Sequence, residues 1–151
     1  MKETEMKISS TAFQHQGRIP SVYTCEGDGF NPPLEFANIP HETQSLALIV
    51  EDPDAPHGTF DHWIVWNVPL RTHINEHSNP GINGMNGGGK TGYYPPCPPS
   101  GQHRYYFTVY ALDSMLNIEP GSDKQALLTA MEPHILGKAV LMGTYEKKNK
   151  K

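Results

Sequence analysis

The sequence predicts a mainly β protein, an antiparallel β-sandwich with one or two short helices near the C-terminus. Several short segments rich in β-branched and aromatic residues lie far apart along the chain. Glycine and proline, with 14 of each, indicate many turns. Helical patterning is confined to one segment, which is too little for the crossovers of a parallel sheet. The length of 151 residues predicts a single domain over 1–151.

The strand predictions rest on two kinds of pattern. Residues 46–50 are continuously apolar, as in a strand buried on both faces. Residues 104–111 alternate, so Tyr105, Phe107 and Val109 are expected on one face and Tyr106 and Thr108 on the other. In chain order, the predicted strands are 6–13, 46–50, 62–68, 104–111 and 139–145.

The helix is predicted to follow residue 122. The segment Ser-Asp-Lys-Gln at 122–125 has the form of a capping box. Pro133 is expected to kink the helix, to end it or to begin a second short turn. Its apolar residues at helical spacing are Leu127, Leu128, Met131 and Ile135.

A segment without periodicity runs from Arg71 to Ser100. Such a long loop inside a compact domain is usually functional or mobile. Prolines at 95, 96, 98 and 99 stiffen its second half, so this half is expected to form a shaped wall.

Composition excludes several functional classes. A formal net charge of −4 argues against non-specific nucleic-acid binding, and the basic residues at 147–151 are expected to form a solvated tail. There is no secretory signal pattern, and the run 46–50 is too short to span a bilayer. The two cysteines, Cys25 and Cys97, do not suggest a disulfide framework, so a cytoplasmic protein is predicted.

Two motifs match known patterns without the required context. Residues 84–91 satisfy the phosphate-loop pattern, but a strand should precede it and a helix should follow, and Pro95 and Pro96 come soon after Thr91. The segment His73 to His77 has the spacing of an inverted zinc-protease motif, which works only on a helix. Both are predicted to be loops, the second with two solvated histidines.

Three polar segments adjoin the predicted strands, at 51–56, 60–63 and 96–105. Strand ends and their loops are where a rigid scaffold usually displays a site. If these ends converge, one small pocket is formed by Asp52, His62, His103 and Tyr105. Two imidazoles near a carboxylate, with a tyrosine hydroxyl, would make a compact donor set for a phosphate-like anion. Taken singly, an Asp in a proline-rich turn is usually a turn former, and a His beside Trp is usually a satisfied edge residue.

The motifs Asp52-Pro53-Asp54-Ala55-Pro56, His62-Trp63 and the segment 97–105 resemble the phosphatidylethanolamine-binding protein family, in the prokaryotic branch often labelled Raf kinase inhibitor-like. The resemblance extends from about Val22 to Tyr145. It implies an antiparallel β-sandwich with a small anion pocket at one end. The pocket residues that it implies here are Asp52, Asp54, His62, His103 and Tyr105, with Phe60 as an aromatic wall.

One departure from the family pattern concerns the pocket wall. The family usually has Gly-Pro where this chain has Pro95 and Pro96. Because Pro95 has no N–H, a backbone donor to the anion should be missing and the wall displaced.

These observations predict non-catalytic binding of a small anionic or phosphorylated ligand, without cofactor, metal or stable membrane anchor. One alternative is inhibition of a kinase or serine protease, with residues 79–94 as the contact surface. Another is an acid–base or metal-dependent enzyme built on Asp52, His62 and His103. A homodimer is plausible from the resemblance.

Overall fold

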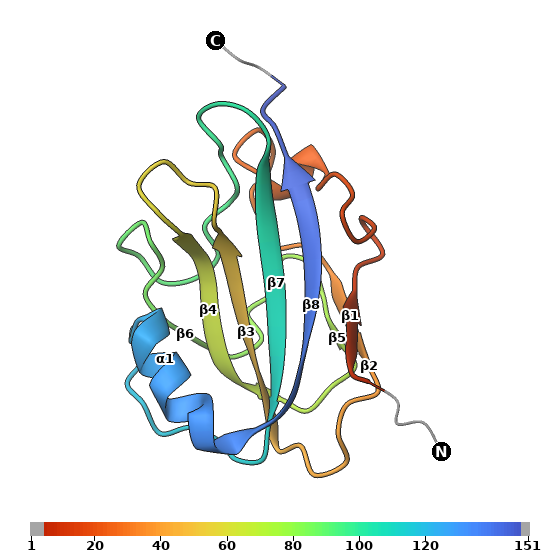
Figure 1. The fold of residues 1–151 in the computed structure, drawn as a ribbon, viewed down its shortest axis with the longest axis vertical. Coiled ribbons are helices and arrows are strands. Elements are labelled where there is room, and N and C mark those ends of the chain that lie inside the picture. The colour runs from red at the N-terminus through yellow and green to blue at the C-terminus, as the bar shows by residue number, and fades with distance from the viewer. Residues whose placement is uncertain (1–4, 149–151) are drawn as a thin grey trace.

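The computed structural model describes residues 5–148, which form two antiparallel sheets packed face to face, with a helix beside the larger one (Figure 1). This confirms the predicted β-sandwich. The larger sheet has the order β6-β4-β3-β7-β8, with β6 at Ile82–Asn83, β4 at Phe60–Pro69, β3 at Ser45–Asp52, β7 at His103–Leu112 and β8 at Ile135–Tyr145. The smaller sheet comprises β1 (Lys7–Ser9), β2 (Leu34–Ala37) and β5 (His73–Ile74), in the order β1-β2-β5.

The apolar run in β3 is buried on both faces, as predicted. Leu46, Leu48 and Val50 join the main core, which fills the space between the sheets. Ala47 and Ile49 join a second cluster under the helix. The run is continuous because the protein covers this strand on both sides.

Strand β7 has one buried and one half-buried face, as its alternating pattern predicted. Its inner face joins the main core, and its outer face is only partly covered. The inner residues are Tyr105, Phe107, Val109 and Ala111, and the outer ones are Tyr106, Thr108 and Tyr110.

Helix α1 spans Lys124–Met131 and is capped by Asp123, not by Ser122 as the capping-box pattern suggested. The Asp123 carboxylate accepts a hydrogen bond from the Ala126 N–H at 3.0 Å, whereas the Ser122 hydroxyl donates to the Glu119 carbonyl. Pro133 ends the helix within a 3₁₀ turn, η2, at Glu132–His134.

The chain then enters β8 directly. Ile135, which the helical spacing had assigned to the helix, is the first and exposed residue of that strand. Another 3₁₀ turn, η1, spans Ser21–Tyr23.

Three short strands were not predicted. Strands β2, β5 and β6 have only two to four residues each. Segments this short carry too few alternating positions to reveal a period of two. Strands β5 and β6 lie inside the stretch 71–100, which otherwise has the irregular structure expected of it.

The two cysteines were not expected to form a disulfide framework, and this prediction was wrong. Cys25 and Cys97 are disulfide-bonded across 72 residues, with their Cα atoms 5.4 Å apart. A backbone hydrogen bond from the Cys25 N–H to the Pro96 carbonyl, at 3.0 Å, joins the same two segments. Composition cannot reveal this pairing, because the fold of the loops brings the two residues together. Bonded cysteines do not indicate a reducing compartment, so they give no support to the predicted cytoplasmic location.

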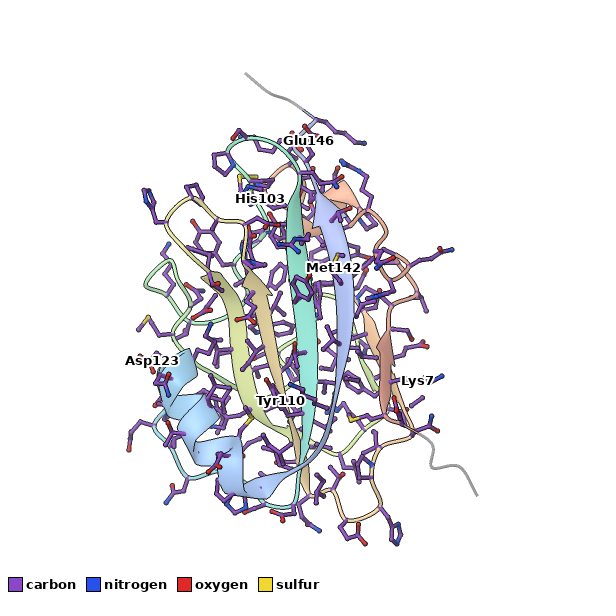
Figure 2. All side chains as sticks on the ribbon, viewed as in Figure 1. Lys7, His103, Tyr110, Asp123, Met142 and Glu146 are labelled. Carbon is purple, nitrogen blue, oxygen red and sulfur yellow. A yellow bond between two sulfur atoms is a disulfide. The ribbon has the colours of Figure 1, made fainter. Side chains whose placement is uncertain are left out.

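The antiparallel order places the ends of four strands together. Asp52 at the end of β3 pairs with Phe60 at the start of β4, and His103 at the start of β7 pairs with Tyr145 at the end of β8. His103 accordingly lies near the upper end of the sheet in Figure 2. Within residues 5–148, no helix has the length and apolarity needed to cross a membrane.

Candidate functional site

A pocket of about 280 Å³ opens at this end of the larger sheet, where β3 ends and β4 and β7 begin. Its polar side chains come from these three strands, and its apolar wall comes mainly from the connecting loops. The polar residues are Asp52, His62, His103 and Tyr105. The wall residues are Ala55, Pro56, Phe60, Tyr94, Cys97, Pro98 and Pro99.

Asp52 and His103 form a buried pair. Nδ1 of His103 lies 2.6 Å from Oδ2 of Asp52, and both residues are less than one-tenth exposed. Since an ionised carboxylate only accepts, Nδ1 of His103 carries the hydrogen. The other oxygen of Asp52 accepts the Asp54 N–H at 2.8 Å, which fixes the carboxylate. Nε2 of His103 is thereby left for a ligand, with the ring orientation set by Asp52.

His62 reaches the pocket because of a β-bulge. Val50 pairs with Trp63 and Glu51 with Asp61, so His62 is an extra residue in β4. Trp63 lies in the main core, and strict alternation would turn His62 to the opposite face. The bulge keeps His62 on the pocket side and directs Asp61 outward, to Lys124 of α1 at 2.8 Å.

The hydrogen bond of His62 fixes its tautomer. Nδ1 lies 2.6 Å from the Tyr94 carbonyl oxygen, which only accepts, so Nδ1 carries the hydrogen. Burial lowers the pKa of His62, and this effect outweighs the Tyr94 carbonyl and the charges of Asp52 and Asp61, which raise it. The ring is therefore neutral at pH 7, and Nε2 is an acceptor.

Tyr105 is fully buried and has an unused donor. Within the described residues, its hydroxyl makes no hydrogen bond of ordinary geometry, although it lies near Asp52. Burial raises the pKa of Tyr105, and so do the charges of Asp52 and Asp54 and a weak hydrogen-bonding contact with Asp52, so the hydroxyl stays protonated. Its ring lies 5.2 Å from that of His62 and 6.5 Å from that of His103. A buried hydroxyl without a partner is costly, which makes it the most informative feature of the pocket.

Three rings line one side of the pocket. The Phe60 ring meets His62 at 4.8 Å and Tyr94 at 5.0 Å, and both contacts are edge-on. His62 and Tyr94 lie 5.9 Å apart. These contacts, at distances typical of aromatic pairs, hold the His62 ring together with its hydrogen bond to the Tyr94 carbonyl.

Comparison with known proteins assigns the family. A family model described as phosphatidylethanolamine-binding protein matches residues 9–146. The chain belongs to the phosphatidylethanolamine-binding protein family. Among curated relatives, the UPF0098 protein of Methanothermobacter thermautotrophicus is 45% identical over 94% of this chain and 99% of its own length. The UPF0098 protein of Chlamydia trachomatis is 48% identical, with the same coverage of both chains.

Solved structures of the family have the same fold. The crystal structure of a putative phosphatidylethanolamine-binding protein homologue from Chlamydia trachomatis matches with a TM-score of 0.92 and 46% identity, over 95% of this chain and 99% of the other. Escherichia coli YbcL, described as a new member of the mammalian family, matches with a TM-score of 0.87 and 26% identity, over 96% of this chain and all of the other.

Five of the eight site residues expected from the family resemblance line the pocket, and three do not. The five are Asp52, Phe60, His62, His103 and Tyr105. Asp54 instead binds the Arg104 side chain through both of its oxygens, and this hydrogen-bonded guanidinium lowers the pKa of Asp54 to about 2. Pro95 faces Gly29, and the Pro96 carbonyl accepts the Cys25 N–H.

The wall includes residues that sequence reasoning had not singled out. Tyr94 comes from the stretch without periodicity, so nothing in its spacing marked it. Cys97, Pro98 and Pro99 belong to the proline-rich half of this stretch, which was predicted to form a shaped wall, and all three line the pocket. Pro95 was expected to displace the pocket wall, but it is not among the lining residues. Pro98 and Pro99 form this part of the wall instead.

The phosphate-loop pattern at 84–91 and the zinc-protease spacing at 73–77 do not form the structures that those motifs require. Residues 84–92 form a turn with no helix after it, so they do not make a phosphate loop. His73 and His77 are exposed, and the His77 ring stacks on Phe30 at 4.8 Å. In the part of the chain that the structure describes, no group of three or more His, Cys, Asp or Glu side chains is arranged to hold a metal ion.

Proposed function

We propose that the protein binds a small anionic or phosphorylated ligand in this pocket and does not transform it. The observation that carries the proposal is the Tyr105 hydroxyl, a fully buried donor that makes no hydrogen bond of ordinary geometry within the described residues, in a cavity that also contains His103. A phosphate oxygen would satisfy this donor, which otherwise costs folding free energy. Family membership supports a ligand-binding or regulatory role in general terms.

The donors of the pocket suit an anion that also carries a hydrogen. The Tyr105 hydroxyl donates, and Nε2 of His103 donates when the ring is protonated. Nε2 of His62 is an acceptor at pH 7, because burial lowers the pKa of that ring. A phosphate monoanion, which has both P–O⁻ and P–OH groups, would complement this set better than a dianion.

The same groups argue for binding in preference to nucleophilic catalysis. Of residues 5–148, those that line the pocket include no Ser, Thr or Lys, and the cysteine among them, Cys97, is in a disulfide. Ser100 is exposed and is not among the lining residues. Asp and Tyr side chains can also act as nucleophiles, but Asp52 is held by His103 and by the Asp54 N–H, and the Tyr105 hydroxyl stays protonated, so binding is the simpler account. Acid–base chemistry by Asp52 and His103 is the remaining alternative.

The proposal can be tested by nuclear magnetic resonance titration of the ¹⁵N-labelled protein with inorganic phosphate and with phosphoethanolamine. We expect saturable shifts at the amides of Asp52, His62 and His103. Tyr105→Phe should weaken binding by about tenfold or more, as for loss of a hydrogen bond to a charged group. Tyr110→Phe, which removes a half-buried hydroxyl from the other face of the same strand, should bind like the wild type.

Shifts spread over the surface without saturation, or equal losses in Tyr105→Phe and Tyr110→Phe, would overturn the proposal. Turnover of phosphoethanolamine during the titration, seen as new phosphorus signals, would favour the acid–base alternative.

A further inference from the structure

The glycine-rich turn 84–92, which resembles a phosphate loop in sequence, lies behind the aromatic wall of the pocket. It follows β4 through backbone hydrogen bonds. The Gly84 N–H donates to the Ile64 carbonyl and the Gly87 N–H to the Asp61 carbonyl, each at 2.7 Å. Two residues beyond the turn, the Tyr94 N–H donates to the His62 carbonyl at 2.8 Å. The turn is thus fixed beside the strand that carries Phe60 and His62.

Asn86 holds the turn in shape from inside. It is 5% exposed, and its side-chain oxygen accepts the N–H groups of Gly88 and Lys90 at 2.9 and 3.2 Å. Its side-chain nitrogen donates to the Gly92 carbonyl at 3.0 Å. Because the buried amide makes three hydrogen bonds, the backbone of this turn resists displacement.

Two glycines of the turn touch the rings of the wall. A Cβ added at Gly87 would lie 2.8 Å from two carbons of the Phe60 ring. A Cβ added at Gly88 would lie 2.3 Å from Cε2 and 2.7 Å from Cδ2 of Tyr94. These distances are shorter than van der Waals contact, so a side chain at either position must move a ring or the turn.

These glycines are not needed for backbone conformation. The left-handed glycines of the region are Gly89 and Gly92, with φ of 77° and 102°, whereas Gly87 and Gly88 do not have positive φ. An alanine could therefore adopt their backbone angles. What requires glycine at both positions is the space that the rings of Phe60 and Tyr94 occupy.

We infer that Gly87 and Gly88 set the width of the pocket, and so determine the size of the group that it accepts beside the anion. Phe60 and Tyr94 line the pocket while the two glycines do not, so the rings stand between the turn and the cavity. With the turn held by Asn86, a methyl group at Gly87 or Gly88 displaces the rings toward the cavity. The inference rests on the proposed function.

The cavity has room for more than an oxyanion. Its volume of about 280 Å³ corresponds to about nine water molecules at about 30 Å³ each. A phosphate group fills only part of it. The remaining space adjoins Phe60, Tyr94, Pro98 and Pro99, which suit a flat apolar substituent on the phosphate. An aryl phosphate is the ligand class that would use both the polar end and this wall.

The test compares inorganic phosphate with phenyl phosphate by calorimetric titration of the wild type, Gly87→Ala, Gly88→Ala and Met85→Ala. Met85 is an exposed residue of the same turn and serves as the matched control. We expect the wild type and Met85→Ala to prefer phenyl phosphate. Each glycine variant should lose about tenfold in affinity for phenyl phosphate, the factor for about one aromatic contact, and keep its affinity for inorganic phosphate.

The two glycines act on different rings, so either variant tests the inference if the other fails to fold. Equal loss of both ligands, or an unchanged preference for phenyl phosphate, would overturn the inference and leave the proposed function intact. Failure of the wild type to bind either ligand would overturn both.

Discussion

Nδ1 of His62 lies 2.6 Å from the carbonyl oxygen of Tyr94, and the Tyr94 N–H donates to the carbonyl of His62 at 2.8 Å. Two hydrogen bonds thus join a bulged strand residue to a loop residue 32 positions away. They fix the tautomer of a buried imidazole and place the Tyr94 ring at the pocket.

Stability should depend on pH through His62. Burial lowers the pKa of this group in the folded state below its ordinary value of 6.5. As pH falls below 6.5, the unfolded chain binds a proton that the folded chain does not, so the free energy of unfolding decreases. The contribution of neutral His62 to the free energy of unfolding is fully present above pH 6.5. It is lost as the pH falls from 6.5 through the folded-state pKa. Urea unfolding at pH 8 and pH 5.5 should show a smaller loss for His62→Gln than for the wild type.

The control for this experiment is His57→Gln, which changes an exposed histidine in the β3–β4 loop. It should behave like the wild type. A pH dependence that is identical in all three proteins would contradict the assignment of a neutral, buried His62.

Tyr105→Phe should stabilise the protein while weakening ligand binding. The substitution removes a buried hydroxyl that makes no hydrogen bond of ordinary geometry within the described residues, and it keeps the ring in the core. Since an unsatisfied buried polar group costs about 1–3 kcal/mol, we expect unfolding of the ligand-free variant to cost about 1 kcal/mol more. Chemical denaturation without phosphate measures this directly. A destabilised variant would mean that the hydroxyl is satisfied in the free protein, for example by water.

The Cys25–Cys97 bond should stabilise the fold and the pocket wall together. The two residues are 72 positions apart, and a cross-link over such a loop contributes about 4 kcal/mol in the chain-entropy model. A reducing agent should therefore lower the melting temperature of the wild type. The double variant Cys25→Ser/Cys97→Ser should melt at the lower temperature with or without the reductant. If the reductant left the melting temperature of the wild type unchanged, this would contradict a stabilising disulfide bond.

Asp52 and Asp54 should differ in their effect on the pocket, although both belong to the motif that carries the family resemblance. Asp52→Asn removes the carboxylate that orients His103, and we expect anion affinity to fall by about tenfold or more. Asp54→Asn disrupts a pair with the exposed Arg104 and should leave affinity within about twofold. Titration with inorganic phosphate measures both. An equal loss of phosphate affinity in the two variants would show that Asp54 also contributes to ligand binding.

The sequence by itself determined the sandwich and most of the pocket. The continuous apolar run in β3 could be stable only when covered on both faces, and the alternation in β7 placed His103 and Tyr105 on one side. Asp52 follows β3 directly, so its position at the strand end was also predictable. These features depend on local periodicity, which neighbouring residues encode without reference to the rest of the chain.

The tertiary structure decided the features that depend on contacts between distant segments. The bulge in β4 sets the face of His62, and it depends on the register between β3 and β4. The Cys25–Cys97 bond depends on how two loops meet, and the Asp54–Arg104 pair depends on how the β3–β4 loop lies against β7. Gly87 and Gly88 belong to a recognisable sequence motif, but their steric role follows only from the contact of the turn with the Phe60 and Tyr94 rings. Such contacts are steric and pairwise over long separations, so no pattern within a short segment of sequence can specify them.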